Sequence, residues 1–175
     1  ILSGDSDFVQ LLAPNVTILD GVNERIITQS GVSDFKGRRL EFNVDPSKGK
    51  LKVGDKAKDD WQPEPEWWRK ALFIKIIRGD DGDGIFSAYP GVRYEGSSKK
   101  TGIKEAWEDR NSGGFHWNNF MLQRWTKLLG KDADGNAITE DVRVLDEYKF
   151  NESLIDLTKQ PEEIKELMDT VIVQA

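Results

Sequence analysis

The segment from Glu66 to Gly79 constrains the fold most strongly, because both of its ends and its buried face can be predicted. Pro65 precedes it and suits the first turn of a helix, where the missing N–H of proline is not needed. Gly79 can adopt the positive φ at which many helices end. Apolar residues recur every three or four positions, at Trp67, Trp68, Ala71, Leu72, Ile74 and Ile76. This stripe predicts a helix over 66–78 that is buried against a sheet.

Shorter elements precede this helix. Residues 1–3 read as the end of a strand, and residues 6–12 as a short helix that is stopped by Pro14. The segments VTIL and RIITQ alternate apolar and polar residues around DGVNE, which predicts a hairpin. Residues 43–65 are rich in Lys, Gly, Asp and Pro, so we expect a long loop there.

The chain after Gly79 is expected to be mainly helical. An irregular stretch leads to a helix over 102–110, with Thr101 or Ser98 as its cap. FHWNNFMLQRWTKLL reads as a Trp-rich helical segment, and GKDADGNAITED as a polar turn. A last amphipathic helix begins at Pro161. Its apolar face carries Ile164, Leu167, Met168, Val171 and Ile172.

The residue types that are missing limit the available chemistry. The chain has no cysteine and one histidine, His116, which excludes disulfides, zinc–thiolate sites and cysteine nucleophiles and argues against Ser-His-Asp catalysis. Carboxylates and a hard cation are the remaining tools. No apolar run approaches the roughly 20 residues that a membrane-spanning helix needs, so we expect a soluble globular protein without a membrane partner.

Charge is divided unevenly along the chain. The net charge of −6 argues against a simple nucleic-acid-coating protein. Basic residues gather at 36–39, 48–58 and 99–100, whereas acids gather around 80–83 and in the C-terminal part. Such a chain can still bind a polyanion if a metal neutralises the acidic centre. The plainer interpretation of the 48–58 run is a solvated, flexible loop.

Two pairs of aspartates occupy positions that local rules disfavour. Asp5 and Asp7 follow the expected strand end, and Asp80 and Asp83 follow a helix C-terminus, which already presents partial negative charge. Ligands gather at the carboxyl ends of strands in open α/β sheets, and a divalent cation would reverse these repulsions. The four residues are therefore candidate metal ligands, with Asp81 as a weaker candidate. The alternative is two unrelated acidic turns.

Motifs in three regions, roughly 1–30, 66–110 and 151–173, resemble the second half of the 5′-nuclease (flap endonuclease) superfamily. ILSGDSDFVQL is similar to the family's strand that ends in Asp-x-Asp, and IKIIRGDDGDGI to its helix that ends in Gly-Asp-x-x-Asp. PGVR and KKTGIKEAWEDR resemble its helix–three-turn–helix unit, and NESLIDLTKQPEEI resembles a later segment. The chain most resembles the ribonucleases H of T-even-like bacteriophages.

The resemblance implies an α/β fold: a partial PIN/5′-nuclease-like domain with a helix–three-turn–helix DNA-binding extension. Residues 1–95 would form the C-terminal part of the α/β nuclease core, and residues 96–175 the helical DNA-binding and C-terminal region. The implied activity is that of a metal-dependent 5′→3′ nuclease (a 5′–3′ exonuclease, flap endonuclease or ribonuclease H). It would act on RNA–DNA primers or 5′ flaps in bacteriophage DNA replication, in the cytoplasm of the host cell.

The resemblance also assigns roles to individual residues. The metal ligands would be Asp5, Asp7, Asp80 and Asp83. They would hold two Mg²⁺ ions, or Mn²⁺, which activate water and stabilise the charge on the phosphate. The residues holding a phosphate of the duplex strand, together with the amides that open the helix there, would be Lys99, Lys100, Thr101 and Lys104. The partners would be branched DNA or an RNA–DNA duplex, and replication proteins such as a single-strand-binding protein.

The chain departs from the family pattern at several points. Gly84 stands in place of an Asn, and RYEGSSK replaces the glycine-rich turn before the Lys-Thr helix. The family's first metal-binding Asp, its helical arch and a Glu/Asp pair precede the Asp-x-Asp strand and have no counterpart in these 175 residues. We therefore expect a truncated form with little or no nuclease activity, whose sheet edge would allow dimerisation. A non-catalytic branched-DNA-binding module and a PIN-type ribonuclease acting on single-stranded RNA stay open as alternatives.

Two further features are interpreted as structural. We expect His116 and most of the six tryptophans to be packing or surface residues rather than contacts to nucleic acid. DADGNAITED hints at a calcium loop, but its glycine falls at the fourth position instead of the sixth, so we expect a turn.

Overall fold

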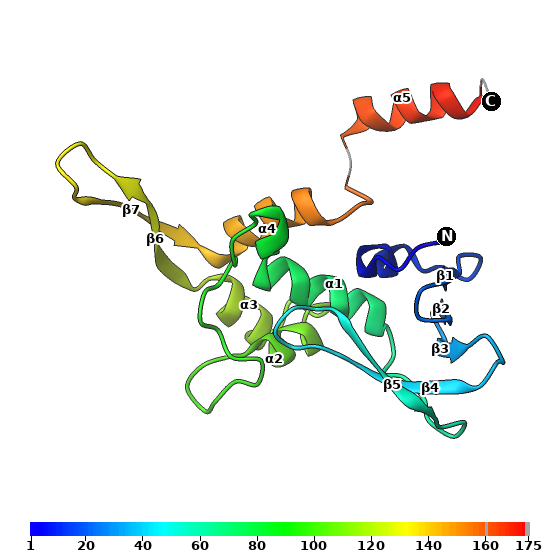
Figure 1. Ribbon diagram of the computed structural model, residues 1–175. Helices are drawn as coiled ribbons and strands as arrows, with labels where there is room; N and C mark the ends of the chain where they lie inside the picture. The colour runs from blue at the N-terminus through cyan, green and yellow to red at the C-terminus, as the bar shows by residue number, and fades with distance from the viewer. Residues whose placement is uncertain (160, 174–175) are drawn as a thin grey trace.

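The computed structural model describes residues 1–159 and 161–173 and shows a mixed α/β protein. A five-stranded antiparallel sheet in the order β1-β2-β3-β4-β5 occupies the N-terminal part of the chain (Figure 1). Its strands are β1 (Ile18–Asp20), β2 (Arg25–Thr28), β3 (Gly31–Asp34), β4 (Arg39–Val44) and β5 (Leu51–Ala57). The coarse α/β expectation is confirmed in this form.

The elements before β3 follow the sequence closely. β1 and β2 form the predicted hairpin, with Ile18 opposite Ile27. The short helix is a 3-10 helix, η1 (Ser6–Leu11), which ends before Pro14. The first residues, in contrast, do not form a full strand. Leu2 makes a single parallel bridge to Leu19 of β1, at the edge of the sheet.

The prediction of a long loop over 43–65 is wrong for 43–44 and 51–57, which belong to β4 and β5, whereas 45–50 and 58–65 lie outside helices and strands. β4 and β5 form an antiparallel hairpin through this segment, with Asn43 opposite Lys52 and Val44 opposite Leu51. Leu51 and Val53 pack on the core, whereas the lysine between them faces solvent. Lysines are typical of an edge strand, because they discourage pairing with another chain. The lysine-rich composition therefore reflects an exposed strand rather than a loop.

The predicted central helix is α1 (Trp67–Arg78), and it joins two hydrophobic cores. Near its start, the indole of Trp67 packs edge-on against Phe42 of the sheet, and its Nε1 donates to the carbonyl oxygen of Gln29 (3.0 Å). Its second half packs against the C-terminal helices. The helix ends at Gly79, as predicted, with φ at +76° and an N–H that donates to the carbonyl oxygen of Lys75 (2.8 Å).

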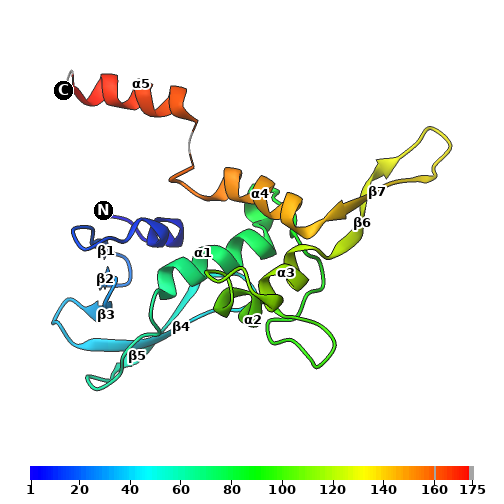
Figure 2. The ribbon, with the colours of Figure 1, turned by 180° about the vertical axis from the view of Figure 1, so that it is seen from behind.

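Three helices pack around the second half of α1: α2 (Ile103–Glu108), α3 (Phe115–Met121) and α4 (Val144–Ile155) (Figure 2). α2 is the helix predicted over 102–110. Neither Thr101 nor Ser98 caps it, however. Gly102 is the N-cap residue, and its N–H donates to the carboxylate of Glu105 (2.8 Å).

The Trp-rich segment is helical only in its first half. After α3, the chain forms β6 (Arg124–Lys131), which pairs with β7 (Ala137–Arg143) in a separate two-stranded sheet. This hairpin extends away from the rest of the chain (Figure 1). The predicted polar turn over 130–141 is confirmed only at the tip of the hairpin, where the Asp132 carboxylate accepts the N–H groups of Asp134 (2.9 Å) and Asn136 (2.8 Å). Its remaining residues belong to β6 and β7. The helix prediction fails for 122–129 because that segment satisfies its backbone by pairing with β7, a strand that the sequence did not reveal.

Neither β7 nor α4 was predicted, yet α4 helps to position α1. Asn151 of α4 is buried, and its side-chain amide donates to the carbonyl oxygens of Ile76 (3.0 Å) and Phe86 (2.8 Å). One side chain therefore links α4 to the end of α1 and to the loop that follows it.

The last predicted helix is present as α5 (Glu162–Val173), which extends away from the other helices in both views (Figures 1 and 2). Ile164 and Leu167, on its predicted apolar face, are exposed. The side chains of Met168, Val171 and Ile172 lie outside the described residues. Within the described part of the chain, no helix has the length and apolar character needed to cross a membrane.

Gly49, in the turn between β4 and β5, lies directly against α1. Its φ is +70°, and a Cβ there would overlap the carbonyl oxygen of Ala71 and lie 2.7 Å from the backbone nitrogen of Lys75. Gly49→Ala is expected to lower the free energy of unfolding by about 2 kcal/mol, because the left-handed conformation costs about 1–2 kcal/mol and the overlap adds to it. Denaturant titration measures the loss.

Gly37→Ala is the matched control. Gly37 also has a positive φ, +80°, but a Cβ there would meet nothing within 4 Å. It should therefore show the conformational cost alone. Equal losses for the two variants would mean that the contact between Gly49 and α1 contributes nothing to stability.

Candidate metal centre

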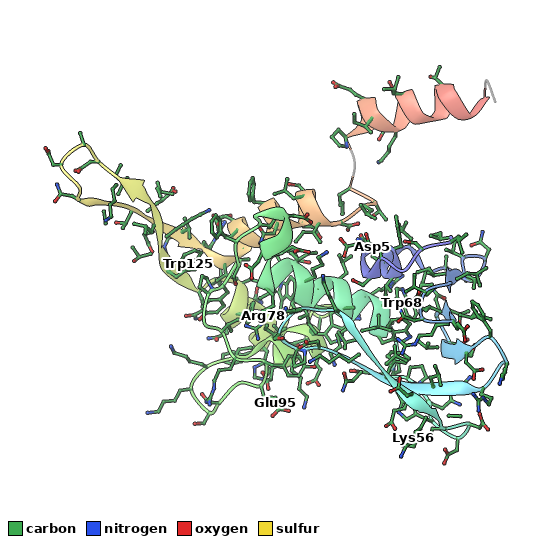
Figure 3. All side chains as sticks on the ribbon, viewed as in Figure 1. Asp5, Lys56, Trp68, Arg78, Glu95 and Trp125 are labelled. Atoms are coloured by element: carbon green, nitrogen blue, oxygen red, sulfur yellow. The ribbon has the colours of Figure 1, made fainter. Side chains whose placement is uncertain are left out.

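Asp7 lies in the first turn of η1 and faces α1. Asp5 caps this short helix, since its carboxylate accepts the N–H of Asp7 (2.9 Å). One turn later, the side chain of Gln10 donates to the carbonyl oxygen of Ile155 (3.1 Å) and accepts the N–H of Leu157 (2.8 Å). η1 is therefore attached to the end of α4 as well as to α1. Asp5 is exposed at the start of the element (Figure 3).

Asp80 and Asp83 lie in a tight turn directly after α1. Asp80 exchanges two backbone hydrogen bonds with Ile85, both of 2.9 Å, and its carboxylate accepts the N–H of Gly82 (3.0 Å). The short 3-10 helix η2 (Asp81–Asp83) fills the turn. This geometry brings the two carboxylates of the Gly-Asp-x-x-Asp motif to the same side.

Three of the four predicted ligands meet in space. Asp7, Asp80 and Asp83 each offer one carboxylate oxygen, and these oxygens all lie within 4.8 Å of one another. We call this group the acidic triad; it is the one such group in the described residues. Asp5 is not part of it, because its carboxylate caps η1 instead. The weaker candidate Asp81 is not part of it either.

Lys75 is the residue that the sequence analysis missed. Its side chain is only 8% exposed, and its Nζ lies 2.5 Å from a carboxylate oxygen of Asp7 and 2.9 Å from one of Asp80. The signal was present in the sequence: Lys75 stands four residues after Ala71, on the buried stripe of the helix. A lysine buried on such a stripe needs a partner of opposite charge, and here it has two.

These contacts shift the ionisation of both groups. The hydrogen bond and charge of Lys75, followed by the N–H of Gly82 and the charge of Lys50, hold the pKa of Asp80 below its usual range. Burial alone would lower the pKa of Lys75, but its hydrogen bonds to Asp7 and Asp80 outweigh that effect and raise it. Both groups are therefore held in their charged forms at neutral pH.

The acidic triad fits a single hard divalent cation. Two oxygens bound to the same ion at about 2.0–2.6 Å lie no more than about 4–5 Å apart, which the triad satisfies. Three carboxylates and one ammonium leave two negative charges, which one such cation would balance. The donor set, oxygen without nitrogen or sulfur, suits Mg²⁺, Mn²⁺ or Ca²⁺. A second ion would need ligands besides these three.

The residues expected to hold duplex DNA surround the start of α2. Lys99 and Lys100 are exposed on the turn that closes between Ser97 and Lys100. Thr101 is half-buried, and its hydroxyl lies 3.3 Å from Nδ1 of His116. Lys104 pairs with Glu95 at 3.2 Å.

The amides that open α2 are not free for a phosphate. The N–H of Gly102 donates to Glu105, that of Ile103 to the carbonyl oxygen of Arg93 (3.1 Å), and that of Lys104 to the carbonyl oxygen of Tyr94 (2.9 Å). The expectation that these amides bind phosphate is therefore wrong, because the protein itself already occupies them. The side chains of Lys99 and Lys100 are exposed, whereas that of Lys104 is paired with Glu95.

The remaining candidates behave as structural residues. His116 is exposed at the start of α3, where its backbone N–H donates to the carboxylate of Asp109 (2.8 Å). All six tryptophans are buried or half-buried, and they pack into the two cores. In the turn read as a possible calcium loop, the Asp132 carboxylate is occupied by backbone and side-chain donors of the turn itself.

Comparisons with protein-family models, with curated proteins and with solved structures found no match to this chain. Its function therefore has to be argued from its own residues.

Proposed function

We propose that this chain binds a divalent cation at the acidic triad and hydrolyses phosphodiester bonds in nucleic acid. The observation that carries the proposal is the convergence of Asp7, Asp80 and Asp83 to within 4.8 Å, from two segments that are far apart in the sequence. Clustered carboxylates without histidine or cysteine are the ligand set that Mg²⁺ and Mn²⁺ prefer. Phosphodiester hydrolysis is a reaction for which such ions suffice.

Each residue of the site has a distinct role in this proposal. Asp7, Asp80 and Asp83 hold the ion, and Lys75 orients two of them through its ion pairs. A bound divalent cation would supply Lewis-acid stabilisation of the phosphate and activation of water. The fixed turn around Asp80 and the capped start of η1 keep the carboxylates in place before substrate arrives, which lowers the cost of reorganisation.

We further propose that the substrates are RNA–DNA primers or 5′ flaps in bacteriophage DNA replication, cut from the 5′ end. The order of the motifs supports this proposal: an Asp-x-Asp segment, a helix ending in Gly-Asp-x-x-Asp, and a Pro-Gly-Val segment before a Lys-Thr helix. In this proposal, α2 and α3 serve as the helix–three-turn–helix unit that binds the duplex. Lys100 and Thr101 line a pocket of about 280 Å³ together with the Pro-Gly-Val loop, where a phosphate of the duplex strand would lie.

The test is a cleavage assay on 5′-flap DNA and on an RNA primer paired with DNA. Both substrates are labelled at each end in turn and incubated with Mg²⁺, with Mn²⁺ or with a chelator. Short labelled products from the 5′ end that depend on the metal support the proposal. Absence of any metal-dependent product on either substrate contradicts it, and cleavage confined to single-stranded RNA would favour a PIN-type ribonuclease.

One observation favours a second candidate, a branched-DNA-binding module without catalysis. Lys75 already neutralises part of the charge on Asp7 and Asp80, so these carboxylates need no metal to be stable. This candidate predicts tight binding of flap DNA with an affinity that is the same in Mg²⁺ and in chelator, and no cleavage. Binding and cleavage measured on the same preparation separate the two functions.

Replacing Lys99 and Lys100 by alanine is expected to weaken duplex binding and to reduce the slope of log K against log salt by about one to two, since each phosphate contact contributes about one. Both lysines are exposed beside the pocket at the start of α2. Fluorescence anisotropy across a salt series measures the slope. Lys131→Ala with Lys149→Ala removes the same charge elsewhere and should leave the slope unchanged; an equal slope for all three proteins would make Lys99 and Lys100 ordinary solvated residues.

A further inference from the structure

A pocket of about 230 Å³ borders the acidic triad on the side of Asp80. Basic side chains from the β4–β5 turn and from the end of α1 form one wall of the pocket, and the turn that carries Asp80 and Asp81 forms the other. Its lining residues are Ser47, Lys48, Lys50, Arg78, Gly79, Asp80, Asp81 and Gly82. We call it the basic pocket.

The turn that carries the two lysines is firmly held. The buried carboxylate of Asp45 accepts the N–H (2.8 Å) and the hydroxyl (2.6 Å) of Ser47, and it pairs with Lys52 at 2.9 Å. Gly49, between the two lysines, lies against the backbone of α1, where no larger residue fits. Lys48 and Lys50 therefore start from a fixed backbone beside the triad.

Arg78 connects this turn to the opposite side of the pocket. Its Nε donates to the carbonyl oxygen of Pro46 (3.1 Å), and its Nη1 donates to the carbonyl oxygen of Val92 (2.7 Å). Neither acceptor is a carboxylate, so these bonds do not neutralise its positive charge, which the nearby carboxylate of Asp45 only partly offsets. Figure 3 shows Arg78 at the centre of the molecule, at the end of α1.

The two lysines also carry uncompensated charge. Lys52 pairs with Asp45, whereas Lys48 and Lys50 are exposed and form no ion pair with any of the carboxylates whose side chains the structure describes. Three cations therefore face a pocket whose other wall belongs to the candidate metal site. An anion that contacts both walls would satisfy this arrangement.

We propose that Lys48, Lys50 and Arg78 bind a phosphate group of a nucleic-acid strand and present it to the acidic triad. This inference rests on the proposed function, whose reacting group it positions. The pocket is smaller than the roughly 300–1,000 Å³ of sites that enclose drug-sized ligands, so it suits a phosphate rather than a whole nucleotide. Lysine and arginine are the side chains that bind phosphate by charge and by hydrogen bonds.

The bound phosphate can come from two sources. It can be the 5′-terminal phosphate of the strand or a phosphate inside the backbone, since both present the same anionic oxygens. The experiment therefore uses flap DNA with a 5′ phosphate and the same DNA with a 5′ hydroxyl. Binding is followed by fluorescence anisotropy in Ca²⁺ and in chelator.

Lys48→Gln combined with Lys50→Gln is expected to weaken binding of the phosphorylated flap about tenfold and to reduce its salt slope by about one to two. The matched control is Lys56→Gln with Lys131→Gln, which removes the same charge far from the pocket; Lys56 lies at the opposite end of β5 (Figure 3). The control should change affinity less than about twofold. Equal binding by the Lys48/Lys50 variant and the wild-type chain, or equal loss in the control, overturns the proposal.

Comparing the two flap substrates, with a 5′ phosphate and with a 5′ hydroxyl, identifies the source of the phosphate. If the terminal phosphate is bound, the hydroxyl form binds the wild-type chain more weakly and the Lys48/Lys50 variant no longer distinguishes the two forms. If a backbone phosphate is bound, the variant weakens both forms equally. Either result supports a phosphate site in the basic pocket.

Failure of this inference can be told apart from failure of the proposed function. Metal-dependent cleavage that is unaffected in the Lys48/Lys50 variant, with unaffected binding, would remove the phosphate site and leave the nuclease. Loss of binding in the variant, together with a wild-type chain that neither cleaves nor binds metal, would keep the phosphate site and remove the nuclease. Thermal shift with Mg²⁺ alone provides the metal readout, and the shift of the variant should be at least as large as that of the wild-type chain, because two positive charges beside the metal site are removed.

Discussion

Asp80→Asn is expected to reduce Mg²⁺-dependent cleavage by at least about a hundredfold, because a metal ligand that stabilises the transition state by several kcal/mol is lost. The asparagine keeps a carbonyl oxygen that can accept the N–H of Gly82, so the turn after α1 should survive. Initial rates on flap DNA at saturating Mg²⁺ give the loss. Thermal shift without metal shows whether the variant is still folded.

Asp134→Asn is the control for this variant. Asp134 is exposed at the tip of the β6–β7 hairpin, and it belongs neither to the acidic triad nor to the lining of the basic pocket. The same charge is removed away from the site, so its rate should stay within about threefold of the wild-type rate, as for an ordinary surface charge. Comparable losses at both positions would indicate a general charge effect instead of ligation. Full activity of the Asp80 variant would exclude Asp80 as a ligand.

Lys75→Met is expected to lower the free energy of unfolding by about 3 kcal/mol in the absence of divalent cations. Removing one partner of a buried ion pair leaves the other charge uncompensated, and here Asp7 and Asp80 would face each other without a cation between them. Added Mg²⁺ should restore a large part of the loss, because the ion takes the place of the ammonium and binds only the folded state. Denaturant titration with and without Mg²⁺ measures both effects.

Lys70→Met is the matched control on the same helix. Lys70 is equally buried, at 7% exposure, but it pairs with Glu64, away from the acidic triad. Its replacement should destabilise the fold without making stability more sensitive to Mg²⁺. If the two variants respond to Mg²⁺ alike, the ammonium of Lys75 does not occupy the place of a cation.

Acidification should distinguish the Lys75 variant from the wild-type chain. In the wild-type chain the pKa of Asp80 is lowered, so its contribution to stability is complete above about pH 4 and is lost as the pH falls through the folded-state pKa. In the variant, Asp80 faces the carboxylate of Asp7 without a cation between them, and this repulsion raises the pKa of Asp80. Lowering the pH from about 6 to about 4 should then stabilise the variant while it leaves the wild-type chain nearly unchanged.

The sequence predicts the fold best where a residue type has a single common structural role, such as proline before a helix or glycine at its end. Pro65, Gly79 and the apolar stripe between them predicted α1 to within a residue. The two Asp pairs were expected to converge because acids at element ends are costly, and three of the four do so. Asp5 differs because an Asp before a short helix can accept a backbone N–H, a local use that the spacing alone does not distinguish from ligation.

The features that could not be predicted depend on distant partners. β5 was read as a loop because its lysines face solvent at a sheet edge, and β6 was read as a helix because its partner β7 lies beyond a polar turn. Lys75 was overlooked because its two carboxylates belong to η1 and to the turn after α1. In each case the residue's environment is set by pairing across the chain, which a local pattern does not contain.

The order of strands in the five-stranded sheet, in which each strand pairs with its neighbour in sequence, affects when the acidic triad forms during folding. Every strand pairs with the strand next to it in sequence, so the sheet consists of local contacts that can form early in folding. The pair between Asp7 and Lys75, in contrast, joins residues 68 positions apart, and the entropy of closing that loop must be overcome first. We therefore expect the acidic triad to assemble after the sheet, once α1 has docked on η1. During refolding, the recovery of metal affinity would accordingly mark the completion of folding. The formation of the β-sheet, followed by circular dichroism, would mark its onset.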